Sequence, residues 1–213
     1  MKMGVPSKNS DPKDVMLMQF RRDSLNKLYR GKRLDEVAKL HGKNADETVL
    51  DLIAADKSPI AALFFLMSEQ NVKQFMQLPY VSFCSDAGSI AAEKSMANTG
   101  AHPRTYGSFA RVLGHYVREE KLFSLEEAIR RLTALPASNL KIKKRGSLKV
   151  GNYADVVVFD ANTIRDNATF EQPHQYATGM IHVFINGEQV LRDGEHTGAL
   201  PGRSIKGPGW IKR

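Results

Sequence analysis

The chain has 213 residues, of which 42% are apolar and 25% charged, which is close to the usage of ordinary globular proteins. This composition argues against a disordered, collagenous or disulfide-framework protein. The longest apolar run, 60–67, is much shorter than the ~18 residues of a membrane span, so we expect no membrane partner. The single cysteine, Cys84, and the polar first fourteen residues favour a reducing, cytoplasmic location.

The net charge is +8, from 31 basic and 23 acidic residues, which makes nucleic acid the first partner to consider. The basic residues are scattered along the chain, and the tightest clusters, at 30–33 and 141–145, contain no interleaved aromatic residues. The sequence shows no zinc-finger spacing, helix-turn-helix signature or RNA-binding aromatic motif. We therefore expect no nucleic-acid partner, because charge alone indicates solubility and non-specific attraction.

Up to residue 135 the sequence alternates between strand and helix patterns. Short apolar runs predict buried strands over 15–20, 61–67 and 80–84. Apolar spacing and capping residues predict the intervening helices: one over 34–41 that stops at Gly42, one capped by Asn44, one capped by Ser68, and one from Ser124 to Pro136. Such alternation is typical of βαβ units with a parallel sheet.

After residue 135 the pattern becomes rich in strands. A β-branched run covers 154–159, and strands over 180–185 and 188–192 flank Asn186-Gly187, the strongest short signal for a hairpin. Asp193-Gly194 predicts a second turn. We therefore divide the chain into an irregular lead-in (1–14), an α/β region (15–135) and a β-rich region (136–213).

Asp86 is the best single candidate for a catalytic residue. It follows the strand predicted over 80–84 and precedes a loop that contains glycine, and α/β folds build their sites at that end of the strands. An Asx-turn or a helix cap is the structural alternative. Cys84 lies two residues earlier and should share a face with Asp86 in a strand. A lone cysteine in an apolar strand usually belongs to the core, however.

The segment 101–119 is dense in arginine, histidine and tyrosine. Arg104 could clamp a carboxylate in a bidentate manner, with a surface salt bridge as the alternative. His102 and His115 could serve as ligands or bases, although structural histidines are more common. The sequence contains no His-x-His, His-Glu-x-x-His or Cys-x-x-Cys, the spacings that typically hold a metal.

The sequence contains several short motifs that are characteristic in combination. They are Ser85-Asp86; His102-Pro-Arg104-x-Tyr106-Gly-x-Phe109-x-Arg111-Val-Leu-Gly114-x-Tyr116; Asp166-x-Ala168-Thr-Phe-Glu171-x-Pro173-His-Gln-Tyr176; and His196-Thr-Gly-Ala with Pro201-Gly-Arg203. Together they resemble the N-acyl-D-amino-acid deacylases (D-aminoacylases) of the amidohydrolase superfamily, most strongly over 80–205. Arg145-Gly-Ser-Leu-x-Val-Gly151-x-x-Ala154-Asp155 and Val183-x-Ile-Asn-Gly187 are shared more widely among amidohydrolases.

The resemblance implies an α/β fold: the carboxyl-terminal portion of an incomplete (β/α)8 barrel, followed by part of a small β-sandwich. Asp86 would end the eighth barrel strand and transfer protons beside a zinc-bound water, within ligand distance of the metal. Arg104 would hold the α-carboxylate of an N-acyl-D-amino acid, and Tyr106 and His102 would also contact that substrate.

Two features depart from the family. A barrel needs ~250 residues, more than this chain offers in total. The other metal ligands of the family, an early His-x-His, a bridging cysteine and two later histidines, have no counterpart here, so the zinc site is incomplete. We interpret the chain as the carboxyl-terminal part of a deacylase, either half of a split gene or a truncated reading frame.

Alternatives of different classes remain open. As part of a hydrolase, the chain would be completed by an upstream fragment or by self-association. It could instead be a non-catalytic remnant that binds a partner, or part of another amidohydrolase such as a dihydroorotase-like or hydantoinase-like enzyme. A neighbouring reading frame that carries His-x-His would favour the hydrolase.

Overall fold

The computed structural model describes residues 11–92 and 101–211. They form two compact units. The described residues of the first unit are 11–68, 91–92, 101–102 and Phe170–His174, and those of the second are 69–90, 103–169 and 175–211. No helix in these ranges is long and apolar enough to cross a membrane. The domain division predicted near residue 135 stays a prediction.

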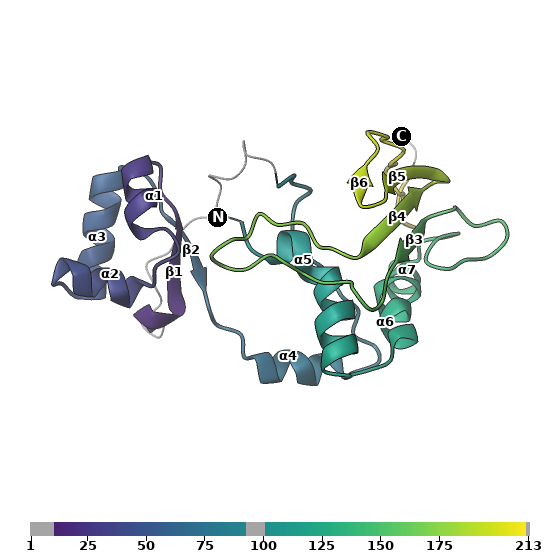
Figure 1. Cartoon of the computed structure of the whole chain (residues 1–213), viewed down its shortest axis with the longest axis horizontal. Helices are drawn as coiled ribbons and strands as arrows, with labels where there is room; N and C mark the ends of the chain where they lie inside the picture. Colours follow the sequence, from purple (N-terminus) through teal and green to yellow (C-terminus); the bar gives the residue numbers. More distant parts are fainter. Residues whose placement is uncertain (1–10, 93–100, 212–213) are drawn as a thin grey trace. The chain divides into compact units, whose positions relative to one another are not determined.

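The first unit places three helices beside a two-stranded antiparallel ribbon (Figure 1). Its elements are η1 (Pro12–Asp14), β1 (Val15–Gln19), α1 (Asp23–Tyr29), α2 (Leu34–His41), α3 (Ala45–Asp56) and β2 (Ala61–Phe64). In the ribbon Val15 lies opposite Phe64. The buried core of the unit consists of Leu17, Phe20, Val37, Leu52 and Ile60.

The local signals in this part of the sequence are largely confirmed. The helix predicted over 34–41 is α2, and Gly42 ends it in the left-handed region at φ 63°. Asn44 caps α3 by accepting the backbone N–H of Glu47 at 2.9 Å. The strand predicted over 61–67 is shorter than expected, because β2 ends at Phe64, the last residue with a partner on β1.

Asp56 carries a buried carboxylate that joins the end of α3 to the loop after β1. Only 1% of the residue is exposed, and its oxygens accept the backbone N–H groups of Arg21 at 2.9 Å and Arg22 at 2.8 Å. The Ser58 hydroxyl donates a third hydrogen bond. Burial alone would raise the pKa of Asp56, but these hydrogen bonds outweigh it and lower the pKa below its ordinary value.

We predict that Asp56→Asn destabilises the protein by about 1–3 kcal/mol at neutral pH, because an amide cannot accept from two N–H groups as a carboxylate does. The folded-state pKa lies below the unfolded value. The contribution of the carboxylate is therefore complete above about pH 4 and is lost as pH falls through the folded-state pKa. Urea unfolding across this range measures the difference. Asp51→Asn, an exposed change on α3, is the control, and equal losses in both variants would contradict the prediction.

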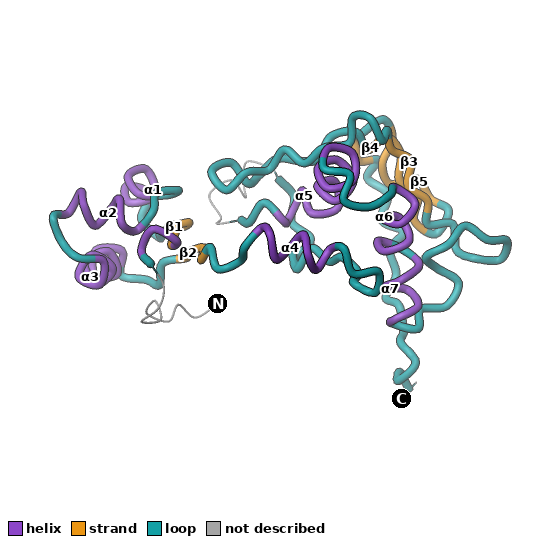
Figure 2. Tube along the Cα trace, turned by 90° about the horizontal axis from the view of Figure 1, so that it is seen from below, coloured by secondary structure: helices purple, strands orange, loops and turns teal. Residues whose placement is uncertain are grey.

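The second unit combines helices with a sheet, three of whose strands are labelled in Figure 2. The sheet is antiparallel and four-stranded, in the order β3-β4-β5-β6. Its helices are α4 (Glu69–Met76), α5 (Arg104–Arg111), the π-helix η3 (Val112–Glu119), α6 (Leu125–Leu132) and α7 (Ala134–Asn139). Its strands are β3 (Val156–Phe159), β4 (Met180–Ile185), β5 (Glu188–Arg192) and β6 (Glu195–His196). Its buried core consists of Met76, Ala110, Val112, Leu113, Tyr116, Ala128 and Ile164.

Turn chemistry fixes the sheet as the sequence predicts. Asn186 and Gly187 both have positive φ, 53° and 85°, as the tight turn between β4 and β5 requires. Asp193 and Gly194, at 50° and 85°, form the second turn and lead into β6. The strands predicted at 154–159, 180–185 and 188–192 are thereby confirmed as β3, β4 and β5, with β3 starting at Val156.

The strand predicted over Tyr80–Cys84 is wrong. This backbone is irregular, and the structure places no neighbouring strand beside it within the described residues. Both described sheets are antiparallel, so the parallel pairing inferred from the alternating pattern is not found there either, although the mixed helix-and-sheet class is confirmed. The apolar character of the segment reflects packing of Phe83 against Phe123, whose rings stack with centroids 6.0 Å apart.

The helix that begins after Ser124 also ends earlier than predicted. Ser124 accepts the N–H of Glu127, as the capping pattern indicates. The helix stops at Leu132 because Thr133 leaves helical geometry, with φ −130° and ψ −76°. Pro136 then sits in the first turn of α7, where a missing N–H costs no helical hydrogen bond.

Candidate active-site region

Asp86 and Arg104 lie together in the second unit. A guanidinium nitrogen of Arg104, at the start of α5, is 3.1 Å from a carboxylate oxygen of Asp86. The two side chains are 43% and 84% exposed, so water screens the pair and it contributes little to stability. The sequence therefore predicted two residues that the fold brings into contact, although it gave no reason to expect that they pair with each other.

No strand precedes Asp86, contrary to the expectation that it ends one. Its φ of 47° lies in the left-handed region, which aspartate tolerates better than most residues. Its N–H contacts the sulfur of Cys84 at 3.3 Å. Cys84 is exposed, so the expectation that it belongs to the core is wrong. The irregular backbone replaces strand geometry and turns this thiol outward.

Tyr106 and His102 occupy different surroundings. Tyr106, on α5, packs edge-on against Tyr176 with ring centroids 5.7 Å apart. Burial, and to a lesser extent the neighbouring Tyr176, raise the pKa of Tyr106, so it stays a neutral hydrogen-bonding group. His102 belongs to the first unit and lies edge-on to Phe170 at 5.2 Å. The substrate-binding roles of both residues stay predictions.

Two glycines of the motif at 102–116 let a second segment approach the helix. A side-chain carbon at Gly107 would lie 2.9 Å from Cβ of Asp166, and one at Gly114 would lie 2.5 Å from the carbonyl oxygen of Ile164. Contacts this short exclude any larger residue. Gly107 and Gly114 therefore allow segment 160–166 to pack closely on α5 and η3.

Arginines on the same helices secure that segment. Arg111 forms an ion pair with Asp166 at 3.2 Å. Arg118 donates to the carbonyl oxygens of Ile164 at 2.6 Å and Ala161 at 3.2 Å. The sequence pattern does not indicate the helix over 104–119, because proline and glycine interrupt its apolar periodicity. These long-range contacts hold the helix in place.

The more widely shared motifs also have a structural role. Arg145 contacts Asp155 and donates to the side-chain oxygen of Asn186 at 2.6 Å. Asp155 in turn accepts the N–H of Asn186 at 2.9 Å. Burial would raise the pKa of Asp155, but the Asn186 amide and the guanidinium lower it. This network ties the loop before β3 to the turn between β4 and β5.

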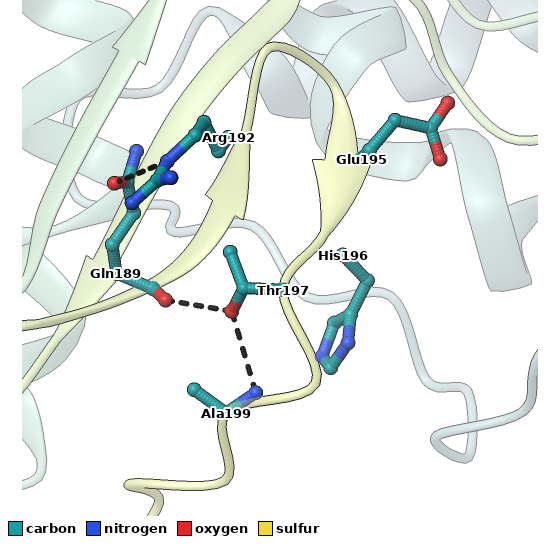
Figure 3. Close-up of a pocket in the computed structure, with 6 residues that line it drawn as sticks. All are labelled: Gln189, Arg192, Glu195, His196, Thr197 and Ala199. Atoms are coloured by element: carbon teal, nitrogen blue, oxygen red, sulfur yellow. Dashed lines mark hydrogen bonds between the residues drawn. The ribbon is translucent and has the colours of Figure 1, made fainter.

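The motif His196-Thr-Gly-Ala lines an open hollow beside β5 and β6 (Figure 3). The Thr197 hydroxyl donates to the carbonyl of Gln189 at 2.7 Å, and the N–H of Ala199 approaches that hydroxyl oxygen at 3.3 Å. These contacts fold the chain after β6 back onto β5. The threonine of the motif therefore serves this turn.

The described residues do not supply a complete zinc site around Asp86. Zinc needs three or four protein donors, and the one converging donor group found in the described ranges is Glu69, His115 and Glu120, which excludes Asp86. That group is already satisfied as an ion-pair network. The Lys73 ammonium lies 2.6 Å from Glu120, and the Tyr116 hydroxyl donates to Glu69 at 2.8 Å. The described residues therefore provide no group of donors that could hold a metal ion beside Asp86.

Comparison with known proteins shows similarity to one family. Residues 95–191 match the profile described as Amidohydrolase family. The chain is 39% identical over 175 residues to a D-aminoacylase and 43% identical over 133 residues to an N-acyl-D-glutamate deacylase, both of Alcaligenes xylosoxydans xylosoxydans. These matches cover 82% and 62% of this chain, but 34% and 26% of the relatives.

A solved structure gives the same result. The N-acyl-D-glutamate deacylase of Bordetella bronchiseptica, complexed with zinc and a phosphonate inhibitor, superposes with a TM-score of 0.72 at 33% identity. The match covers 90% of this chain and 38% of that protein. The chain is therefore similar to members of the amidohydrolase family. It resembles the carboxyl-terminal part of the N-acyl-D-amino-acid deacylases and spans about a third of their length.

We predict that the chain alone binds zinc weakly. Asp86 is the one metal donor that the motif resemblance predicts, and Lys73 already binds the carboxylate of Glu120 in the Glu69, His115 and Glu120 group. After dialysis against a chelator, elemental analysis should find much less than one zinc per chain. Stoichiometric zinc that disappears in His115→Ala would instead identify this group as the site.

Proposed function

We propose that this chain is the carboxyl-terminal part of a metal-dependent N-acyl-D-amino-acid deacylase, which hydrolyses an amide bond to release a D-amino acid and a carboxylate. The single observation that carries the proposal is the contact between Asp86 and Arg104 at 3.1 Å. A proton-transfer group and a carboxylate-binding group thus share one exposed site. Arg104 lies within residues 95–191, which match the amidohydrolase profile, and Asp86 belongs to the motifs that resemble the deacylases.

In the proposed reaction Asp86 takes a proton from the attacking water while the oxygen of that water bonds to the amide carbon. Asp86 then gives that proton to the departing nitrogen as the carbon–nitrogen bond breaks. Its exposure leaves the carboxylate accessible to both groups. A bound zinc ion would lower the pKa of the water. Further donors for that ion must come from outside the described residues.

Arg104 is proposed to bind the α-carboxylate of the substrate. Its guanidinium now faces the carboxylate of Asp86, so a substrate carboxylate would take the place of that partner. The exchange costs little, because exposed ion pairs are weak. It would also release Asp86 for proton transfer, so substrate binding and activation of the base are coupled.

The relatives are about three times as long as the part matched here, and the portion of the deacylase outside this chain would supply the remaining metal donors in a cytoplasmic enzyme. The alternative is a non-catalytic remnant, which the incomplete donor set around Asp86 favours. Mixing the chain with the amino-terminal part of a related deacylase, in the presence of zinc, tests both proposals. Zinc-dependent release of a D-amino acid supports the deacylase, and a stable but inactive complex supports the remnant.

We predict that Asp86→Asn in such a reconstituted enzyme lowers kcat by at least about 100-fold with little change in KM, because the amide keeps the shape but cannot accept the proton. Steady-state kinetics with an N-acyl-D-amino acid measures this. Asp193→Asn, an exposed change in the turn before β6, is the control and should turn over like the wild type. Wild-type turnover by Asp86→Asn would show that the aspartate is structural.

Arg104→Lys should mainly weaken substrate capture, raising KM about tenfold, because lysine keeps the charge but loses the planar fork that matches a carboxylate. It should also reduce the preference for substrates with a free α-carboxylate over the corresponding amides. Comparing kcat/KM for an acid and its amide measures that preference, with Arg192→Lys as the control. An equal effect on acid and amide would rule out the clamp and leave the role of Asp86 intact.

A further inference from the structure

Arg131 on α6 is a charged residue buried in the second unit. Only 1% of it is exposed, and no described carboxylate forms a salt bridge with it. One of its terminal nitrogens is buried without a hydrogen-bond partner. Burial lowers the pKa of Arg131, but a guanidinium keeps its charge in proteins. A buried cation with an unsatisfied donor is costly, which calls for a physical explanation.

The guanidinium of Arg131 holds the chain that leads to Asp86. Its Nε donates to the carbonyl of Val81 at 2.7 Å, and a terminal nitrogen donates to the carbonyl of Met76, the last residue of α4. Its cationic plane lies over the rings of Phe83 at 4.6 Å and Phe123 at 4.9 Å. One side chain therefore contacts three residues between positions 76 and 83.

These contacts take the place of the backbone hydrogen bonds that would pair this segment with a neighbouring strand. Between Met76 and Asp86 the backbone forms neither helix nor strand, so regular hydrogen bonding does not fix its path. Phe83 is three residues before Asp86 and contacts both the guanidinium of Arg131 and the ring of Phe123. Fixing Phe83 limits where the Asp86 carboxylate can lie relative to Arg104.

We propose that Arg131 is a positioning residue that holds the segment carrying Asp86 in place. The role given to Asp86 rests on the proposed function, whereas the ordering of the segment does not. The competing explanation is that Arg131 only stabilises the unit as a whole. The two explanations differ in what happens to the segment while the rest of the protein is still folded.

The single cysteine supplies a reporter inside the segment. Cys84 is exposed and adjoins Phe83, so a nitroxide attached there reports local motion by electron paramagnetic resonance. In Arg131→Met the mobile fraction of the label should rise about tenfold or more. Losing hydrogen bonds to a charged group should shift the equilibrium between the ordered and the mobile segment by at least about tenfold. In Arg131→Lys the label should be as mobile as in Arg131→Met. An ammonium lacks the planar guanidinium that binds two carbonyls and contacts two rings.

Arg118→Met is the matched control. Arg118 also donates to two backbone carbonyls of the same unit, but on segment 161–164 rather than on the Asp86 segment. Both Met variants should melt at a lower temperature by circular dichroism. Only Arg131→Met should mobilise the label below its melting transition. An immobile label in folded Arg131→Met, or equal mobility in both variants, would overturn the proposal.

A second measurement uses the reconstituted enzyme without a label. Arg131→Lys should lower kcat by about tenfold to a hundredfold with KM nearly unchanged, because a displaced proton-transfer group slows chemistry more than binding. Wild-type kcat in Arg131→Lys would also overturn the positioning role. If the wild-type complex shows no activity, the proposed function fails, while the label still tests the ordering of the segment.

Discussion

Hydrogen bonds from arginine side chains to backbone carbonyls hold the irregular segments of the second unit in place. Arg131 binds the segment before Asp86, and Arg118 binds the segment at 161–164. Each guanidinium offers several donors in a fixed plane, so one side chain can satisfy carbonyls that a neighbouring strand would otherwise satisfy. Part of the net charge of +8 thus serves the fold.

A second constraint is the close packing of segment 160–166 on the helix formed by α5 and η3. Gly107 and Gly114 are seven residues apart on the continuous helix formed by α5 and η3, and both face the segment that contains Ile164 and Asp166. Only glycine permits the helix and that segment to lie so close together. The helix that presents Arg104 and Tyr106 is consequently fixed against the rest of the unit, and motif residues that touch no substrate still shape the candidate site.

The sequence predicts which residues form the candidate site, and the structure adds the contact between two of them. The motifs identify Asp86 and Arg104 because residue types recur in a fixed order along the chain. Their mutual ion pair arises from the irregular path of 77–86 and the start of α5, which no local pattern encodes. Arg131 was missed because a lone arginine on a helix is typical of an exposed face, and only its burial reveals its contacts.

The sequence by itself determined the features that depend on neighbouring residues: the caps at Asn44 and Ser124, the turn at Asn186-Gly187 and the family to which the motifs point. Tertiary structure alone decided whether an apolar run became a strand. Val156–Phe159 is one because β4 lies beside it. Tyr80–Cys84 is not, because the described chain places no strand there and Arg131 binds the Val81 carbonyl instead. A strand needs a hydrogen-bonding partner from elsewhere in the fold, whereas a cap or a tight turn finds its partners within a few residues.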